Sequence, residues 1–274
     1  DYYEQLDRLK NFKGIKSKPL PASMQDVLRP YQKAGYDWLY FCKDYGFGGC
    51  LADDMGLGKT LQALAVLLNE KQHGNTKPNL IVCPTSVVFN WEKEIQKCAP
   101  ELSVLIHTGV NRERSADQFA DYDIILTSYG IMRRDIAFLK DLHFHYAVLD
   151  ESQKIKNPAS QTAKASRLLK AAHRLVLTGT PVENNTVELW SQFAFLNPGL
   201  LGSLNYFKQA FTTPIEKHQD TETAAMLRQL IFPFILRRTK ESVAKELPPK
   251  IEQTFYCAMS TEQATLYDEW KSFY

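Results

Sequence analysis

The strongest constraint on the fold is an alternation of short apolar runs with longer amphipathic stretches, which begins at about Arg29. Continuous apolar runs rich in β-branched residues are typical of strands buried on both faces of a parallel sheet. The stretches between them, such as 61–70, 87–98 and 159–169, have helical length and spacing. This alternation predicts an α/β fold with a mainly parallel central sheet flanked by helices. The expected strands are 49–52, 80–83, 104–106, 124–127, 146–149 and 175–177.

The pattern changes after about Pro198. No further strand is expected before 251–257, and the prolines after Leu247 end the preceding helix because proline cannot continue one. We therefore expect a mainly helical insertion over 199–250. Its helix-like segments lie near 206–211, 223–231 and 240–246.

A last helix is expected close to the end of the sequence. Ser260 and Gln263 have the spacing of a capping box, in which each side chain bonds the other residue's backbone N–H. The pair predicts that a helix begins just after Ser260.

Composition excludes several classes of protein. A net charge of +2 over 274 residues is too small to indicate nucleic-acid binding by itself, so any basic surface is expected to be local. No apolar run approaches the ~20 residues that span a bilayer, and no secretory signal is visible, so no membrane association is expected. Five widely spaced cysteines do not resemble a disulfide framework or a zinc site, which favours a reducing compartment.

The segment from Ala52 to Thr60, ADDMGLGKT, follows an expected strand and opens an expected helix, which is the context of a phosphate-binding loop. Glycines at 56 and 58 allow backbone N–H groups to wrap phosphate oxygens, and the helix start adds its positive dipole end. Lys59 is expected to reach the β- and γ-phosphates and Thr60 to ligate Mg²⁺. Asp53 stands where the common pattern has glycine, so a glycine-rich turn with an exposed lysine is the alternative. The expected nucleotide-binding residues are Asp54, Met55, Gly56, Leu57, Gly58, Lys59, Thr60 and Leu61.

Two acids, Asp150 and Glu151, follow the expected strand 146–149. Ligands of open α/β sheets bind at the carboxyl edge of the strands, where these acids would lie. We expect Asp150 to hold Mg²⁺ through a water molecule, because Mg²⁺ gives up its waters reluctantly. Glu151 is expected to act as the general base on the attacking water. Lys59 and the two acids together predict binding and hydrolysis of Mg-ATP.

Four motifs in a fixed order make the chain resemble the Snf2 family of superfamily 2 helicase-related ATPases, and most of all its bacterial members. The motifs are LRPYQ at 28–32, DDMGLGKT at 53–60, DESQKIKN at 150–157 and LTGTPVENN at 177–185. The stretches ELWS at 188–191 and FILRRTK at 234–240 extend the resemblance to roughly residues 25–255. Asp53 fits the pattern of this family, so it no longer counts against a phosphate-binding loop.

The resemblance implies an ATP-driven translocase on double-stranded DNA, with ATP and Mg²⁺ as cofactors. It implies a lead-in segment over 1–27, a RecA-like ATP-binding lobe over 28–198 and the family's helical elaboration over 199–250. Residues 251–274 would begin the connection to a second RecA-like lobe downstream. Because arginines of that lobe are expected to complete the site, this chain alone should bind Mg-ATP but hydrolyse it slowly. The implied location is the cytoplasm, at the nucleoid, for a bacterial protein and the nucleus for a eukaryotic one.

The resemblance also assigns roles to residues outside the phosphate loop. Gln32 would read adenine, because its amide offers both a donor and an acceptor to the base. Coupling of the nucleotide to the DNA-facing side is assigned to Gln153, Thr178, Gly179 and Thr180. Two positions depart from related patterns: Gln153 replaces a histidine, and Glu183 replaces the more usual glutamine.

Contacts to DNA are expected along the loops at the sheet edge, and they would read phosphates with little sequence preference. Capping of helix starts is the alternative role for the serines and threonines among them. Trp91 is expected to be a packing residue. The basic run Arg237, Arg238 and Lys240 leaves two interpretations open: a solvated face, or contact with the partner lobe or DNA. The expected phosphate contacts are Thr85, Ser86, Thr127, Ser128, Lys154 and Lys156.

Two other functions stay open. One is an RNA or single-strand helicase of the same superfamily, although no basic aromatic groove or RNA-binding module is evident. The other is a nucleotide-gated interaction module without catalysis, which the intact Lys59, Thr60, Asp150 and Glu151 argue against.

Overall fold

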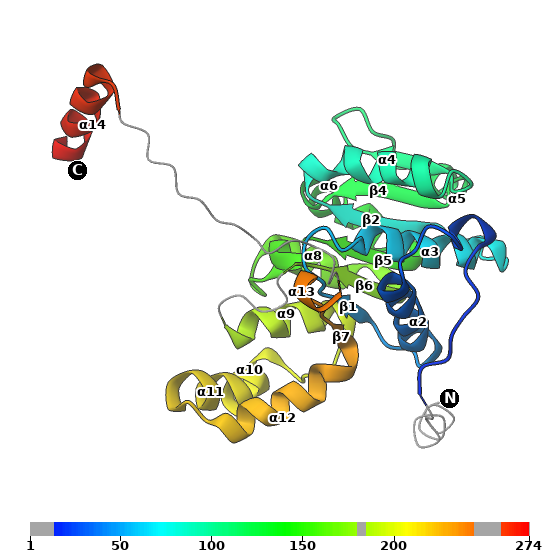
Figure 1. Ribbon diagram of the computed structural model, residues 1–274. Helices are drawn as coiled ribbons and strands as arrows, with labels where there is room; N and C mark the ends of the chain where they lie inside the picture. Colours follow the sequence, from blue (N-terminus) through cyan, green and yellow to red (C-terminus); the bar gives the residue numbers. More distant parts are fainter. Residues whose placement is uncertain (1–13, 180–184, 244–258, 274) are drawn as a thin grey trace. The chain divides into compact units, whose positions relative to one another are not determined.

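The computed structural model describes residues 14–179, 185–243 and 259–273 (Figure 1). In this part of the chain, seven strands form one sheet in the order β3-β4-β2-β5-β6-β1-β7, and every neighbouring pair is parallel. The predicted α/β fold with a parallel central sheet is thus confirmed. All six expected apolar runs form strands: β1 (Gly49–Leu51), β2 (Asn79–Cys83), β3 (Val104–His107), β4 (Ile124–Ser128), β5 (His143–Asp150) and β6 (Lys170–Leu177).

The seventh strand, β7 (Ile235–Leu236), corrects the prediction that no strand follows Pro198 before 251–257. It pairs with β1, with Cys50 opposite Ile235. Two residues are too few to show a periodic pattern, so only the long-range pairing reveals this strand. The strand expected at 251–257 lies outside the described residues.

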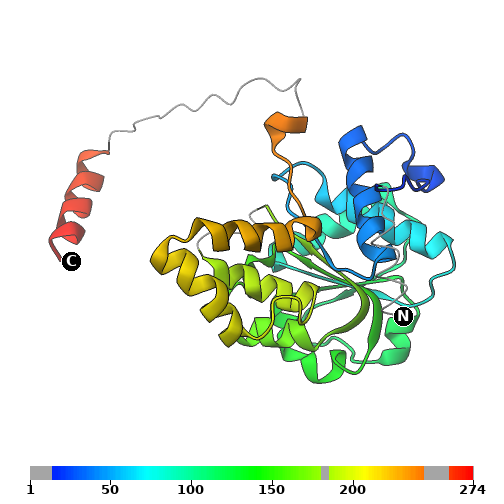
Figure 2. The ribbon, with the colours of Figure 1, turned by 90° about the horizontal axis from the view of Figure 1, so that it is seen from below.

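Helices cover both faces of the sheet, because successive residues of each strand point to opposite sides. On one side, Ile81 and Val148 pack against α2 (Pro30–Asp44), α3 (Lys59–Gln72) and α4 (Val88–Cys98). On the other side, Leu80 and Ala147 pack against the helices that follow β3, β4, β5 and β6. Figure 2 shows the sheet between these two groups. The second group comprises α5 (Ala116–Ala120), α6 (Tyr129–Arg134), α7 (Ile136–Leu139), α8 (Gln161–Leu168) and α9 (Thr186–Leu196).

A helical elaboration follows α9 and has an apolar cluster of its own, in which Phe193 of α9 meets Phe207, Phe211 and Leu227. The helices expected near 206–211 and 223–231 are present. A short helical turn leads from the last of them into β7, so the chain returns to the sheet beside β1. The elements are α10 (Leu204–Phe207), a π-helical turn (Lys208–Thr212), α11 (Thr213–His218), α12 (Thr221–Ile231) and, after β7, α13 (Lys240–Val243).

A second unit of the chain contains α14 (Thr261–Phe273). The Ser260 hydroxyl accepts the backbone N–H of Gln263 at 3.3 Å, and the Gln263 side-chain oxygen accepts that of Ser260 at 3.1 Å. The predicted capping box is therefore confirmed. Across the described ranges, no helix is both long and apolar enough to cross a membrane.

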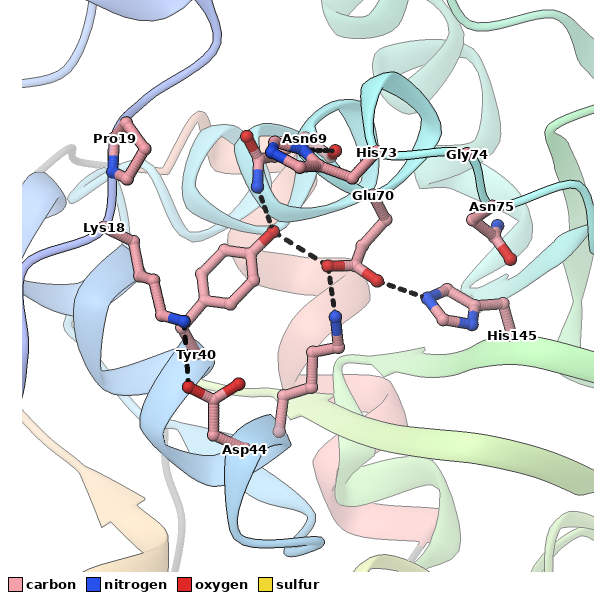
Figure 3. Close-up of a pocket in the computed structure, with 11 residues that line it drawn as sticks. Lys18, Pro19, Tyr40, Asp44, Asn69, Glu70, His73, Gly74, Asn75 and His145 are labelled. Atoms are coloured by element: carbon pink, nitrogen blue, oxygen red, sulfur yellow. Dashed lines mark hydrogen bonds and ion pairs between the residues drawn. The ribbon is translucent and has the colours of Figure 1, made fainter.

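A polar network lies at the amino edge of the sheet, beside a cavity of about 440 Å³ (Figure 3). The Glu70 carboxylate accepts hydrogen bonds from Tyr40 Oη at 2.9 Å, Lys43 Nζ at 2.5 Å and His145 Nε2 at 2.6 Å. Burial alone would raise the pKa of Glu70, but these three hydrogen bonds lower it to about 2. The network joins α2, α3 and β5 at the edge opposite the phosphate loop, so we assign it a structural role.

His173 of β6 borders this network and should make stability depend on pH. Its ring centroid lies 5.1 Å from that of His145. Burial, followed by the charges of His145 and Lys43, lowers the pKa of His173 from 6.5 to about 4. The unfolded chain therefore binds a proton between these pH values that the folded chain does not, so stability falls as pH drops through this window.

We expect His173→Asn to reduce the loss of stability between pH 7 and pH 5 by about 1 kcal/mol. This is less than the pKa shift alone would give, because solvent screens the charge of a partly exposed ring. Urea unfolding of both proteins at the two pH values measures the difference. The pKa of buried His107 is also lowered, but its contribution to the loss of stability is the same in both proteins and cancels in the comparison. Equal losses in the two proteins would contradict the assignment to His173.

Candidate nucleotide site

The phosphate loop connects β1 to α3, and its backbone has the expected shape. Gly56 has φ of 85° and Gly58 has φ of 76°, in the left-handed region that favours glycine. A Cβ on Gly58 would also lie 2.3 Å from Nε2 of Gln32. Gly58 is the N-cap of α3, so the positive end of this helix faces the loop. The loop is thus built to approach an anion closely.

Lys59 begins α3 and turns back over the loop. Its Nζ donates to the backbone oxygens of Asp53 at 2.7 Å and Asp54 at 3.3 Å. Partial burial lowers the pKa of Lys59, and the charges of nearby carboxylates, Glu151 first and Asp150 among them, oppose that shift. The ammonium therefore lies in the field of the two acids that the sequence assigns to catalysis.

The strand register explains why those acids come near the phosphate loop. Leu51 at the end of β1 and Asp150 at the end of β5 are both opposite Leu177 of β6. Two strand spacings, about 10 Å, therefore separate the starts of the two functional loops. Both loops leave the carboxyl edge of the sheet, where ligands of open α/β sheets bind.

Asp150 is held from three directions. One carboxylate oxygen accepts the indole N–H of Trp91 at 2.8 Å, and the other accepts the backbone N–H of Glu151 at 2.9 Å. Tyr129 Oη donates to the backbone oxygen of Asp150 at 2.8 Å. Burial raises the pKa of Asp150, and the Trp91 hydrogen bond acts against that shift. The expected packing role of Trp91 is confirmed by its burial in the core, while its bond to Asp150 was not predicted.

Glu151 adopts a backbone conformation that residues with a Cβ rarely take, with φ of 53°. Its carboxylate accepts the side-chain N–H of Gln153 at 2.8 Å. A non-glycine residue in the left-handed region stores about 1–3 kcal/mol of strain, and such residues gather at functional sites. Gln153, the position that departs from the histidine of related patterns, therefore holds the expected general base.

The donor set around the loop fits Mg²⁺. Thr60 offers a hydroxyl in the first turn of α3 and Asp150 offers a carboxylate, and both are hard oxygen ligands. Mg²⁺ commonly takes only one or two protein ligands and completes its shell with phosphate oxygens and water.

Asp53 has a different role from the glycine that it replaces. It is fully buried, and its carboxylate accepts the Nε of Arg238 at 2.9 Å and the backbone N–H of Arg238 at 3.0 Å. Arg238 Nη2 also donates to Gln62 Oε1 at 2.8 Å, and Nη1 donates to the backbone oxygen of Tyr31. Arg238 is therefore not part of a solvated face, because it makes an ion pair within the lobe. The partners lie 185 positions apart, so no local pattern could have indicated this pair. Contact of the basic run with a partner lobe or DNA stays a prediction.

The chain beyond β7 is tied to the phosphate loop by backbone bonds as well. The Asp54 backbone N–H donates to the Arg238 oxygen at 3.0 Å, and the Asp54 carboxylate accepts the Lys240 N–H at 3.0 Å. These two bonds fix the start of the phosphate loop against the chain that follows β7.

Gln32 lies in the first turn of α2, close to the phosphate loop. Its Nε2 donates to the Leu57 oxygen at 3.1 Å, and its Oε1 accepts the Arg29 N–H at 2.9 Å. Each end of the amide keeps capacity for one further bond, so this arrangement is compatible with reading a base.

Of the residues assigned to coupling, Gln153 follows β5, and the other three follow β6, the strand between β5 and β1. Thr178 is fully buried and its backbone N–H donates to the Leu51 oxygen at 3.1 Å. A Cβ on Gly179 would lie 3.3 Å from Cγ of Met55 in the phosphate loop. Thr180 and Glu183 lie outside the described residues.

The expected DNA contacts divide into two groups. Thr85 and Ser86 are exposed in a turn after β2, and Lys154 is exposed after β5. The buried Thr127 hydroxyl instead donates to the His107 oxygen at 2.7 Å, so its side chain does not face a phosphate.

The other two positions have partners within the protein. The Ser128 hydroxyl accepts the Ile131 N–H at 3.4 Å, which is the capping role left open from the sequence. Lys156 Nζ lies 3.7 Å from a Glu188 carboxylate oxygen.

Comparison with known proteins places these motifs in a family. Residues 31–273 match the model described as the SNF2-related domain. The Bacillus subtilis protein YwqA, whose name proposes an ATP-dependent helicase or translocase, is 48% identical over 90% of this chain and 27% of its own length. The TATA-binding protein-associated factor MOT1 of Saccharomyces cerevisiae is 41% identical over 92% of this chain and 15% of its own length.

A solved structure agrees with these matches. The Sulfolobus solfataricus SWI2/SNF2 ATPase core in complex with dsDNA is 45% identical, with a TM-score of 0.77, and the match covers 94% of this chain and 54% of that one. This chain therefore spans about half of the solved core and a smaller part of the two curated relatives.

Proposed function

This chain belongs to the SNF2-related family, and from that premise we propose that it is the ATP-binding lobe of an ATP-dependent translocase on double-stranded DNA. The observation that carries the proposal is the strand register, which brings the loop of Lys59 and the acids Asp150 and Glu151 to one edge of the sheet. A phosphate loop and a nearby carboxylate that holds Mg²⁺ are the parts with which P-loop enzymes hydrolyse Mg-ATP.

In this proposal each part of the site has one task. The loop N–H groups and Lys59 bind the β- and γ-phosphates, and Gln32 contacts the adenine. Thr60 and Asp150 would hold Mg²⁺, which neutralises charge that develops on the phosphate oxygens. Glu151 accepts the proton of the water that attacks the γ-phosphorus.

The DNA would lie along the same edge of the sheet. Thr85, Ser86 and Lys154 are exposed there, and hydroxyls and ammonium groups contact phosphates without reading bases. The SWI2/SNF2 core that resembles this chain was solved with dsDNA. A second RecA-like lobe in the rest of the protein would complete the nucleotide site, and the site of action would be the nucleoid or the nucleus.

The proposal is tested by ATP hydrolysis, using this chain joined to its natural downstream sequence. Duplex DNA, single-stranded DNA and RNA are added in turn, with Lys59→Ala as the control that should lose nucleotide binding. We expect strong stimulation by duplex DNA. Stimulation by RNA or single strands alone would support a helicase instead, and no stimulation would support a nucleotide-gated interaction module.

A further inference from the structure

We propose that Trp91 is a positioning residue for the magnesium site, which it serves by fixing the Asp150 carboxylate. The inference rests on the proposed function, because it assigns Asp150 to Mg²⁺. Its basis is the hydrogen bond of 2.8 Å from the indole Nε1 to Asp150 Oδ2. Trp91 itself would touch neither the metal nor the nucleotide.

Two donors from separate elements hold this carboxylate. Trp91 comes from α4 and binds Oδ2, while the Glu151 N–H follows β5 and binds Oδ1. A single donor would leave the carboxylate free to rotate about its Cβ–Cγ bond, whereas two donors on different oxygens fix its plane. Since a carboxylate has about four acceptor positions, each oxygen keeps one for the metal or its water.

The Trp91 side chain suits this task because of where it lies. It is 1% exposed, and α4 is anchored to α3 and the sheet through the same apolar cluster. Water therefore cannot replace its N–H at Asp150. The indole is only a donor, so it always presents hydrogen to the carboxylate and never competes for the metal.

Hydrogen bonds to metal-holding groups commonly change metal affinity by about 10–100-fold when removed. We expect Trp91→Phe to raise the Mg²⁺ concentration for half-maximal binding of a non-hydrolysable ATP analogue by about 10-fold. Binding of the same analogue in excess chelator should be unchanged, because the phosphate loop is intact. The measurement is a fluorescence titration of this chain joined to its natural downstream sequence.

Two further proteins separate positioning from packing. Replacing Trp91 with benzothienylalanine keeps the bicyclic shape and removes only the N–H, so it should reproduce the Mg²⁺ effect without a cavity. Trp38→Phe is the matched control: it makes the same change at an indole of α2, whose N–H donates to the Pro233 backbone oxygen at 3.2 Å and not to a residue of the magnesium site. It should leave the dependence on Mg²⁺ unchanged.

The outcomes are distinct. An unchanged Mg²⁺ dependence in the benzothienylalanine protein would overturn the inference, as would an equal loss of binding with and without Mg²⁺. If the unsubstituted protein bound the nucleotide as Lys59→Ala does, the proposed function itself would fail and this inference with it.

Discussion

Replacing Glu151 with glutamine should leave ATP bound and lower its hydrolysis by about 10²–10⁴-fold, the contribution of a positioned general base. The amide cannot accept the proton of the attacking water. It has nearly the same shape as the carboxylate, and its oxygen can still accept the Gln153 N–H that holds Glu151 at 2.8 Å. The substitution therefore removes the proton acceptor with little change in the loop.

Single-turnover hydrolysis, with nucleotide binding measured on the same samples, tests this expectation. The enzyme is this chain joined to its natural downstream sequence, with duplex DNA present. Asp37→Asn is a suitable control, because it makes the same chemical change at a partly buried ion pair on α2, outside the candidate site. Hydrolysis by Glu151→Gln within threefold of the unsubstituted rate would exclude Glu151 as the base.

Local sequence patterns were sufficient to predict most elements of the fold. All six apolar runs form strands; five of them are buried and the run in β3 is partly buried, so their hydrophobic sequence was sufficient to predict them. The capping box at Ser260 is equally local and was confirmed. β7 was missed because its two residues form a strand only by pairing with β1, far away in the sequence.

The candidate site also has residues that local motifs predict and contacts that only the fold reveals. Lys59, Asp150 and Glu151 follow from motifs, because Lys59 ends the glycine-containing loop between β1 and α3, and the two acids stand at the end of β5. The supporting bonds do not: Trp91 lies 59 positions from Asp150, and only the packing of α4 on the sheet brings them together. A buried indole N–H needs a partner, but the sequence does not say which one.

Gly35 shows how a long-range contact explains a local anomaly. Glycine within a helix costs about 1 kcal/mol relative to alanine. A Cβ at Gly35 of α2 would lie 1.9 Å from Gln62 Oε1 and 2.8 Å from Arg238 Nη2. The glycine therefore makes room for Gln62 and for the arginine that binds Asp53.

The ion pair between Asp53 and Arg238 should contribute strongly to stability. Asp53→Ala should lower the free energy of unfolding by about 3–5 kcal/mol, because removing one partner leaves the other charge buried and unpaired. The side chain of Arg238 is 13% exposed, and Asp53 Oδ2 accepts its Nη2 at 2.5 Å. Urea unfolding measures the loss.

A surface pair provides the comparison. Lys18 and Asp44 lie 3.0 Å apart with side chains 36% and 42% exposed, so Asp44→Ala should cost less than about 1 kcal/mol. The double variant Asp53→Ala, Arg238→Met removes both charges and should recover most of the loss, because apolar replacement of a buried pair is often neutral.

A loss for Asp53→Ala no larger than that for Asp44→Ala would contradict a buried, interdependent pair, as would additive losses in the double variant. The expected recovery of stability would show that Asp53 neutralises the charge of Arg238 rather than binding the nucleotide. It would also explain physically how an acid can stand at the start of a phosphate-binding loop: its charge is neutralised from behind, on the side away from the phosphates.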